Sequence, residues 1–578
     1  MRGLIDAVTP GISKAMGNLG VSQSDWSRLI GPATVEAHGD LAIPCHPLAK
    51  ILKKSPIEIA EALSSEISEG LINMAHVSTI NGFVNITANE KWLSSQVSSL
   101  ARSQRLGISS EERRSFVVDY SAPNVAKEMH VGHLRSTVIG DSIVRMLEFK
   151  GHLVHRENHV GDWGTPFGML IEHLLDLGED KAATELGVGD LDSFYKQARS
   201  KFVSDIDFSE RSRRRVVLLQ GGDPETLRLW GILVDESMRY FNEVYSMLGV
   251  LLTDDDIRGE SKYQQLLPVV LERLEDAGVL EKSEGADVTF LGDWVNREGE
   301  PLPLIIRKAD GGYNYSTSDL ACIIDRVERL RSDSFLYVVG TPQKQHFEMV
   351  FQVARKAGLM NDSHQAVHVN FGSVLDSDGK VLKSREGEVV KLFDLLNESV
   401  SRAEAAIEEK NPDLVGDERK EVAEIVGIGA VKYADLSTER TKDYIFDWER
   451  MLSFDGNTAP YLQYAHARIC SIFRKWDGNR DSLQSANIEC SLPEEQLLAR
   501  RLLGFSSAVD EAISIFSPHK LCNHLHSLAS SFASFYENCQ VLNAEGLVKT
   551  SRLALCDLTA RELELGLDLL GIGCPHRM

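Results

Sequence analysis

Apolar positions recur with two different spacings along the chain, and the change from one spacing to the other divides it into segments. Residues 1–112 begin with helical spacing. They continue with two short runs, "GDLAIPC" and "GFVNIT", that are typical of strands. This combination predicts a small α+β module. The polar segment that follows, "SQRLGISSEERR", is typical of a linker.

From Ser115 onward the pattern becomes that of an α/β domain. The run "SFVVDY" predicts a buried strand, and "GHLVHREN" predicts the next one. Helical spacing between the two runs is shown by Leu134, Val138, Ile139, Ile143, Met146 and Leu147. A strand, a helix and a strand within about 45 residues form a βαβ unit, which favours a parallel sheet.

Further strand-like runs lie far downstream, namely "PLIIRKADGGYNYST", "FLYVVG" and "VHVNFG". The stretch from about Phe167 to Glu298 is largely helical and charged, and we interpret it as an insertion that splits the α/β domain. After about Leu392 the pattern is helical to the end. The predicted fold class is α/β. It comprises a Rossmann-type parallel sheet with an inserted mainly helical region, an N-terminal α+β domain and a C-terminal α-helical bundle.

Length and charge limit the possible functions. A chain of 578 residues exceeds the usual size of one domain. The net charge of −23 argues against a general nucleic-acid binder, because phosphate contacts usually leave a basic footprint. The densest basic run contains Arg211, Arg213, Arg214 and Arg215. It is either a local basic patch or, as we favour, a solvated helix face.

The distribution of cysteines and the pattern of apolar residues indicate the cellular compartment of the protein. The eight cysteines form no CxxC pair, and we find no Cys/His set with the spacing of a zinc site. Dispersed cysteines suit a reducing compartment. The N-terminal stretch has no long apolar core, and no run of about 18 apolar residues occurs. We expect a cytoplasmic protein with no membrane segment.

The stretch "PNVAKEMHVGH", from Pro123 to His133, lies where the first predicted strand gives way to the helix. A helix N-terminus offers free N–H groups and a positive dipole end, and ligands bind near the first crossover of an open parallel sheet. Imidazole N–H groups of His130 and His133 would stabilise charge developing on a phosphate, and Lys127 would add a point charge. Gly132 would let a ligand approach the backbone closely.

A structural role for these histidines is the alternative, with one in the core and one as a helix cap. The preceding strand, the following helix, and the upstream Asn124 and Lys127 favour the phosphate site. The longer segment "PNVAKEMHVGHLRST" resembles the HIGH signature of class I aminoacyl-tRNA synthetases, in the form found in arginyl-tRNA synthetases. Other segments similar to that family follow in order: "NHVGDWGTPFGML", "LTDDDIRGESKY", "DGGYNYSTSDLA", "GAVKYADLSTERTKDYIFDWERMLSFDGNTAPYLQYAHAR" and "LTARELELGLDLLG". The resemblance covers essentially the whole chain.

The resemblance implies an activity. An enzyme of this family would activate L-arginine with ATP to arginyl-adenylate and pyrophosphate, and then transfer the arginyl group to the terminal adenosine of tRNA(Arg). His130 and His133 would bind ATP and stabilise the transition state. Mg²⁺ would arrive with the nucleotide, because the chain shows no dedicated metal cage. The resemblance also implies a monomer, and arginine activation that requires bound tRNA.

A second signature of class I enzymes, the KMSKS loop, is degenerate in this chain. Its counterpart is "GKVLKSREGEVV". Aligning the following Arg-Glu-Gly with the family loop puts Val381 and Ser384 where the two signature lysines would stand, while Lys380 and Lys383 lie out of register. In this family a degenerate loop typically accompanies a lysine just before the HIGH signature, and Lys127 fits that position. We hypothesise that Lys127 supplies the missing charge, with Lys383 and Ser384 as the remaining nucleotide contacts from the loop.

Selection of arginine calls for a carboxylate that can bind a guanidinium in bidentate fashion and an aromatic surface. The segment "YNYSTSDLACIIDRVERL" offers both. Its apolar positions predict a helix starting near Ser318, with Asp319 in the first turn and Tyr315 upstream on the strand end. The alternative role of Asp319 is to interact with the helix dipole. By resemblance, Tyr315 and Asp319 match the arginine-binding pair, and Gln343 in "GTPQKQHF" matches a third contact.

The amino and carboxylate end of the substrate has matching residues too. By resemblance, Asn124 and His133 hold this end, next to Ala122 and Pro123. The family often has Ser-Pro-Asn where this chain has Ala-Pro-Asn. A backbone contact at Ala122 would survive that difference, whereas a hydroxyl contact would not. Lysine, the nearest competitor of arginine, cannot satisfy a bidentate acceptor.

The resemblance also suggests four domains with separate roles. They are residues 1–112, which touch the tRNA elbow; residues 113–392, the catalytic domain with its insertion at about 167–298; residues 393–452, a helical connector; and residues 453–578, which read the anticodon. Aromatic side chains of the last domain could stack on splayed bases, although we expect most to be core residues. They are Tyr461, Tyr464, Phe473, Trp476, Phe532 and Tyr536.

Two other functions compete with this interpretation. Another nucleotidyltransferase with an HxGH site would show no dependence on tRNA, and the C-terminal similarities count against it. A synthetase-like RNA-binding protein that has lost catalysis is the second. Loss of His130, His133 or Asp319 would indicate it, and all three residues are present.

Overall fold

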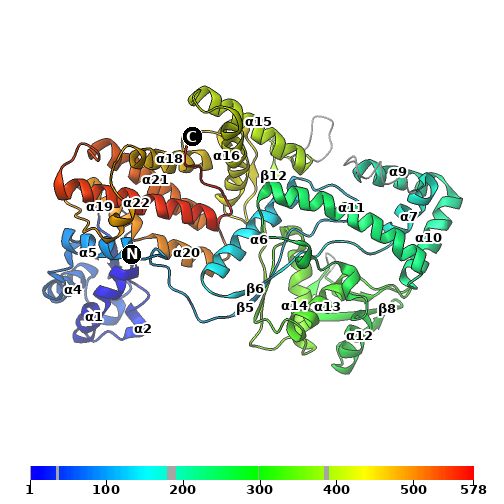
Figure 1. Cartoon of the computed structure of the whole chain (residues 1–578). Coiled ribbons are helices and arrows are strands. Elements are labelled where there is room, and N and C mark those ends of the chain that lie inside the picture. The colour runs from blue at the N-terminus through cyan, green and yellow to red at the C-terminus, as the bar shows by residue number, and fades with distance from the viewer. Residues whose placement is uncertain (1, 34, 36–37, 179–190, 297–298, 383–389) are drawn as a thin grey trace.

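The computed structural model describes residues 2–33, 35, 38–178, 191–296, 299–382 and 390–578. The N-terminal module lies beside the C-terminal helices at one end of the molecule, the parallel sheet lies in the middle, and helices of the predicted insertion lie at the other end (Figure 1). In the described part of the chain, no helix is both long and apolar enough to cross a membrane. The arrangement confirms the predicted fold class.

The N-terminal module is α+β, as predicted. Its strands form an antiparallel sheet in the order β1-β2-β4-β3. They are β1 (Gly31–Pro32), β2 (Leu41–Pro44), β3 (Ala75–Ile80) and β4 (Phe83–Ala88). The helices are α1 (Arg2–Asn18), α2 (Gln23–Trp26), α3 (Ala49–Leu52), α4 (Pro56–Leu71) and α5 (Glu90–Ala101). Helix α4 begins with a capping box, in which Ser55 and Glu58 exchange side-chain and backbone hydrogen bonds.

The central sheet is parallel throughout and has the strand order β11-β10-β5-β6. Its strands are β5 (Ser115–Asp119), β6 (Leu153–Glu157), β10 (Ser334–Tyr337) and β11 (Gln365–His368). Helix α6 (Val131–Phe149) joins β5 to its neighbour β6, which confirms the predicted βαβ unit. Because α6 packs between the sheet and the C-terminal helices, it is buried nearly all round.

A buried network of ion pairs connects β5 and β6 to helix α13 (Tyr315–Glu328), which precedes β10 in the chain. The fully buried guanidinium of Arg326 donates from Nε to Glu157 Oε2 at 2.8 Å and from Nη2 to Asp119 Oδ2 at 2.5 Å. It also lies 4.5 Å from the ring centre of Tyr337. The two carboxylates end β5 and β6, so one side chain of α13 holds the carboxyl ends of two neighbouring strands in place.

The region between β6 and β10 is mainly helical, with one small antiparallel sheet. The helices are α7 (Pro166–Leu177), α9 (Leu191–Ser204), α10 (Ile206–Gln220), α11 (Pro224–Leu248) and α12 (Leu267–Asp276), with the short helices η2 (Asp254–Asp256) and η3 (Glu260–Tyr263). The small sheet has the order β7 (Glu281–Ser283), β8 (Ala286–Val295), β9 (Pro301–Arg307). The run containing "PLIIR" is therefore a strand, but it pairs antiparallel with β8 and does not join the parallel sheet.

The arginine run on α10 is a helix face, and its charges are partly matched within the protein. Arg211 and Arg215 bind the two oxygens of buried Glu172 on α7, at 3.0 and 2.7 Å. Arg214 lies 3.5 Å from Glu210 on its own helix. Arg213 and Arg214 are exposed, as expected of a solvated helix face, whereas Arg211 and Arg215 hold α10 against α7.

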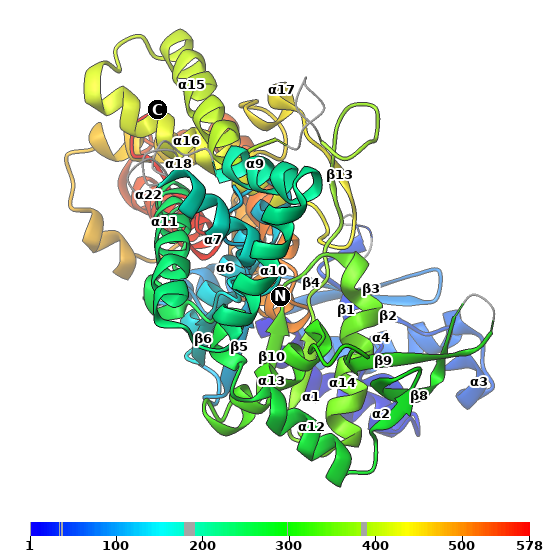
Figure 2. The same ribbon diagram turned by 90° about the vertical axis from the view of Figure 1, so that its right-hand side faces the viewer.

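The C-terminal region is helical, as predicted, except for one short strand. Strand β12 (Val374–Leu375) pairs in parallel with β13 (Tyr444–Ile445). Helices of the catalytic region and its continuation are α14 (Lys344–Lys356), α15 (Leu392–Lys410), α16 (Gly416–Leu436) and α17 (Trp448–Met451), with the short helix η4 (Thr341–Gln343). The terminal bundle contains α18 (Ala459–Arg474), η5 (Arg480–Ser485), α19 (Pro493–Leu502), α20 (Phe505–Ser514), α21 (His519–Asn538) and α22 (Gly546–Leu569). Figure 2 shows this bundle behind α7, α9 and α11.

Candidate active site

The predicted histidines lie at the N-terminus of α6, in a cleft of about 340 Å³. Nine residues line this cleft: Asn124, Lys127, Glu128, Met129, His130, His133, Asp192, Lys196 and Lys391. The structure thus brings together four residues named from the sequence. It adds lysines from α9 and from the segment before α15.

Local hydrogen bonds fix the two imidazole rings. His130 is the N-cap of α6, and its Nδ1 accepts the N–H of Gly132 at 3.0 Å. His133 Nδ1 accepts the N–H of His130 at 3.0 Å. The ring centres lie 3.9 Å apart with an interplanar angle of 35°. Because each Nδ1 is an acceptor, the proton of each neutral ring is on Nε2, which leaves an N–H donor for a ligand.

Both rings are neutral at physiological pH. Burial lowers the pKa of His133 to about 3, and the neighbouring charges of His130 and Lys127 act in the same direction. The pKa of His130 is also lowered, mainly by burial, with Asp192 opposing the shift and Lys127 adding to it. Two neutral N–H donors beside one lysine form a preorganised site for an oxyanion, since they need not reorient as charge develops.

The backbone N–H groups at the start of α6 do not form the anion site expected from a helix N-terminus. Val131 N–H donates to Val390 O at 3.1 Å, and His133 N–H donates to His130 O at 2.8 Å. The N–H of Gly132 is taken by the His130 ring. An anion in this cleft would therefore meet the imidazole donors and Lys127, while the helix contributes its dipole.

Gly132 makes room for the His130 ring, which folds back over its own helix. A Cβ at this position would lie 2.8 Å from His130 Cε1 and 2.9 Å from Nδ1. Close approach of a ligand to the Gly132 backbone stays a prediction.

Replacement of Gly132 by alanine should displace the His130 ring and slow turnover by about 100-fold, because small misplacements of a catalytic group have effects of this size. The fold should persist, since alanine favours a helix. Steady-state turnover kinetics and thermal melting measure the two effects. Gly231→Ala is the matched control, because a Cβ at this position of α11 meets no atom within 4 Å. Unchanged turnover in Gly132→Ala would contradict the role given to His130.

Lys127 lies in the cleft, as the hypothesis about the degenerate loop requires. Its Nζ is 4.6 Å from the ring centre of Tyr195 on α9. This cation–π contact holds the ammonium group near both histidines, as its effect on both pKa values shows. A second lysine, Lys391, is 2.7 Å from the buried carboxylate of Glu128.

The structure describes the segments immediately before and after the degenerate loop. Residues 374–382 form a hairpin, in which Leu382 N–H donates to Val374 O at 3.0 Å. Val381, which takes the place of the first signature lysine, is exposed on this hairpin. Downstream, His130 and Lys391 form an antiparallel bridge, so the end of the loop returns to the HIGH signature. Lys383 and Ser384 lie outside the described residues.

The segment before the signature has an unusual backbone. Ala122 has a φ of 48°, in the left-handed region. Its N–H donates to Asn158 Oδ1 at 3.0 Å, so a backbone contact to a substrate would have to use the carbonyl group. Pro123 and Asn124 then pair with Gly161 on the neighbouring loop, which leaves the Asn124 side chain exposed in the cleft.

Tyr315 and Asp319 are together on α13, and His346 on α14 joins them. Asp319 Oδ2 lies 2.6 Å from His346 Nε2. The ring centres of Tyr315 and His346 are 4.7 Å apart. Tyr315 is 61% exposed, so its ring is available as a surface for a planar cation. Gln343 ends η4 and is exposed three residues before His346.

The predicted start of this helix was wrong. Helix α13 begins at Tyr315, where the Asn314 side chain accepts the Tyr315 N–H at 3.0 Å as an N-cap. Tyr315 is thus the first helical residue, and Asp319 lies in the second turn. The spacing of four places both side chains on one face of the helix. The alternative of a first-turn carboxylate that serves the dipole no longer applies.

Sequence reasoning missed His346 and Glu260 near Asp319. The pKa of Glu260 is raised to about 7, chiefly by burial; the charges of Asp162 and Asp319 add to this, and His159 opposes it. Glu260 follows Gly259 in the segment "RGESKY" and starts η3. Its sequence signal was its place in "LTDDDIRGESKY", one of the segments similar to the arginyl-tRNA synthetase family. The region around Asp319 is therefore rich in acidic groups, as a cation site requires.

Known proteins are similar to this chain along its length. The family model for the class I (R) tRNA synthetase catalytic domain matches residues 96–448. An arginine–tRNA ligase of Thermobifida fusca is 49% identical over 533 residues, with 92% of each chain covered. The chain belongs to the arginyl-tRNA synthetase family. This confirms the family and class predicted from the motifs.

Other arginyl-tRNA synthetases show the same correspondence. The N-terminal domain model of this family matches residues 6–88, and the DALR anticodon-binding domain model matches residues 462–578. A relative from Klebsiella pneumoniae is 46% identical, covering 94% of this chain and 93% of its own. The arginyl-tRNA synthetase structure from Plasmodium falciparum has a TM-score of 0.83 at 28% identity, over 100% of this chain and 99% of that one. The Thermus thermophilus structure has a TM-score of 0.79 at 26% identity, with 100% of both chains covered.

Proposed function

We propose that this arginine–tRNA ligase, a class I synthetase that uses ATP, forms arginyl-adenylate in the cleft at the start of α6. The observation that carries the proposal is the paired His130 and His133, each with Nδ1 fixed and Nε2–H left as a donor. When the arginine carboxylate attacks the α-phosphorus, negative charge builds on the phosphate oxygens. The two neutral donors and Lys127 stabilise that charge.

The proposed reaction consists of two displacements, and the attack of the arginine carboxylate is the first. The carboxylate oxygen forms a bond to the α-phosphorus as the bond to pyrophosphate breaks. Mg²⁺ that enters with the nucleotide would supply positive charge for the leaving group. The 3'-terminal adenosine of tRNA(Arg) next attacks the mixed anhydride through a ribose hydroxyl, and AMP leaves. Lys383 and Ser384 are proposed loop contacts to the nucleotide, and Gly132 supports His130.

Arginine is held between α13 and α14 in this proposal. Asp319 receives the guanidinium in bidentate fashion, Tyr315 covers one face, and Gln343 supplies a third contact. Asn124 and His133 hold the amino and carboxylate end, next to Ala122 and Pro123. The 2.6 Å contact between His346 Nε2 and Asp319 Oδ2 supports this assignment, because it places a nitrogen within hydrogen-bonding distance of the carboxylate on that side.

Competition between arginine and lysine tests the pocket. Arginine should be charged at least about 10,000-fold more efficiently than lysine in kcat/KM, since lysine leaves buried acceptors unpaired. The measurement is steady-state charging of tRNA(Arg) with each labelled amino acid at saturating ATP. Comparable kcat/KM values would show that the acidic groups around Asp319 do not select the guanidinium.

Contacts to tRNA follow from the domain division. We propose that residues 1–112 touch the tRNA elbow and that residues 453–578 read the anticodon, with catalysis in residues 113–392 and a connector at 393–452. Tyr464 and Tyr536 are the best candidates for base stacking, because they are 39% and 38% exposed with Arg468 against both rings. Of the other four aromatics, Phe532 is buried, and Tyr461, Phe473 and Trp476 pack against the core. We further propose that the enzyme is a cytoplasmic monomer.

A further inference from the structure

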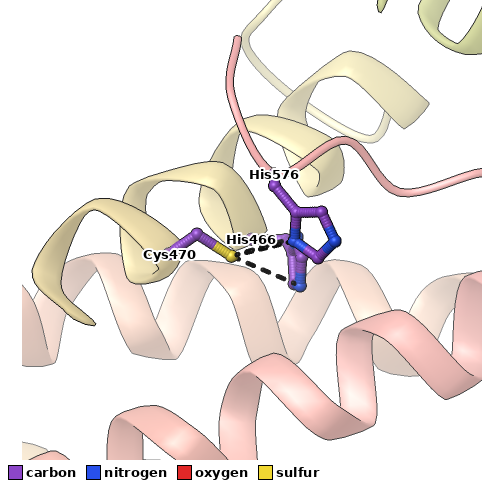
Figure 3. Close-up of side chains that lie close together, drawn as sticks. All are labelled: His466, Cys470 and His576. Atoms are coloured by element: carbon purple, nitrogen blue, oxygen red, sulfur yellow. Dashed lines mark hydrogen bonds between the residues drawn. The ribbon is translucent and has the colours of Figure 1, made fainter. Parts of the chain in front are cut away.

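Three potential metal ligands converge where the C-terminal tail crosses α18. His466 and Cys470 are four residues apart on this helix, so their side chains share one face (Figure 3). His576 reaches the same point from the tail that follows α22. Cys470 Sγ lies 3.7 Å from His576 Nδ1 and 3.8 Å from His466 Nε2. Ligand atoms of all three lie within 4.8 Å of one another.

These distances fit a tetrahedral zinc centre. Zinc–sulfur and zinc–nitrogen bonds of about 2.3 and 2.0 Å at a tetrahedral angle place the two ligand atoms about 3.5 Å apart. We propose that His466 Nε2, Cys470 Sγ and His576 Nδ1 bind one Zn²⁺ ion, with water as the fourth ligand. Imidazole and thiolate together favour zinc over magnesium or calcium, which take oxygen ligands.

Cys470 Sγ lies 3.8 Å from both ring nitrogens of His466, so the choice between them rests on the other contacts of the ring. Its Nδ1 lies 3.2 Å from the backbone carbonyl oxygen of Pro575 and donates to it. This bond places the proton on Nδ1, so the lone pair is on Nε2. A metal-binding histidine almost always donates its other ring N–H in this way.

Access and charge are consistent with ion entry from solvent. His466 and Cys470 are buried, whereas His576 is exposed, so the site opens at one side. Zinc binding would form the Zn–S bond as the Cys470 thiol releases its proton to water. In its protonated form the thiol makes only weak hydrogen bonds to the two rings.

The tail is already held in the position that the site needs. Arg474 Nη1 donates to the carbonyl oxygen of His576 at 2.9 Å. Arg577 binds Glu418 at 3.0 Å, and Asn411 donates to the carbonyl oxygen of Met578 at 3.1 Å. The third ligand is therefore preorganised, and a bound ion would fasten the tail across the helices of the C-terminal domain. Sequence spacing missed the site, because 106 positions separate Cys470 from His576.

Cobalt and zinc titrations of the full-length protein test the proposal. After removal of metal with EDTA and then removal of the chelator, Co²⁺ should bind with one equivalent and produce a thiolate-to-cobalt charge-transfer band. Zn²⁺ should displace it and raise the melting temperature. Cys470→Ser should abolish the band, and His576→Ala should weaken binding by about 10-fold or more.

Matched controls separate the site from other thiols and histidines. Cys45→Ser removes a buried thiol and His76→Ala an exposed imidazole, both in the N-terminal module, and neither should change the titration. His576 is exposed, so its replacement leaves the fold intact even if Cys470→Ser does not fold. A charge-transfer band that persists in Cys470→Ser would overturn the proposal, as would its absence from the native protein. Equal Co²⁺ affinity in His576→Ala and native protein would overturn it as well.

Discussion

Replacement of Asp319 by alanine should reduce kcat/KM for arginine by at least about 1,000-fold, with most of the loss in KM. The carboxylate is mostly buried and has a 2.6 Å contact to His346, so its acceptor atoms are directed into the space between α13 and α14. Without this carboxylate, a guanidinium that enters the space between the two helices would give up its hydrogen bonds to water. It would find too few acceptors in the protein to replace them. Charging kinetics at varied arginine measure the effect.

Two further variants show what this experiment measures. Asp325→Ala is the matched control, because Asp325 is on the same helix but binds Arg329, at 2.6 Å. It should leave KM for arginine unchanged. Asp319→Asn keeps an oxygen acceptor but loses the charge, and should fall between native protein and Asp319→Ala. An unchanged KM in Asp319→Ala would refute the assignment of this pocket to the guanidinium.

Replacement of Lys127 by alanine should lower the rate of arginine activation by about 100-fold or more, with little change in KM for arginine. Lys127 lies close enough to His130 and His133 to lower the pKa of each, although burial is the main cause. Its charge is thus next to the two donors that we propose face the phosphate. Loss of one preorganised group of this kind costs roughly 10²–10³ in rate. Tyr195 holds the ammonium group in place, so the position is specific.

Lysines of the same cleft and of the degenerate loop provide the comparison. Lys383→Ala should have a much smaller effect than Lys127→Ala, because Lys383 lies out of register with the signature. Lys196→Ala tests whether any positive charge in the cleft suffices, since Lys196 lines the same cleft. Equal and small effects of all three substitutions would show that Lys127 does not replace the loop lysines.

The sequence predicted where helices and strands lie more reliably than it predicted which strands pair with each other. Apolar spacing located β5, α6 and β6, because a buried strand and a helix have different periods. It placed the start of α13 three residues late, because the first turn is polar. Ser316 and Thr317 in that turn donate their hydroxyl groups to the carbonyl groups of Ile305 and Ile306, so tertiary contacts replace the apolar signal. Strand β9 was identified, but its pairing with β8 left no trace in its own residues.

The candidate site shows the same limit. His130 and His133 are three residues apart, so the motif alone brought them together. Lys391 pairs with His130, and His346 contacts Asp319, although the segments involved are far apart in the sequence. Residue spacing within one segment cannot predict such contacts. The contact between Gly132 and the His130 ring could not be predicted either, because only the folded chain shows the ring beside this glycine. Distances between segments far apart in sequence had to come from the structure.

Arginine-dependent pyrophosphate exchange, run with and without tRNA(Arg) and beside ATP-dependent charging with labelled arginine, tests the central claim most directly. The account predicts charging, and exchange only when tRNA is present. It predicts that both activities are lost when His130 and His133 are replaced by alanine in a protein that still folds. Exchange without tRNA and without charging, or full activity in the double variant, would contradict it.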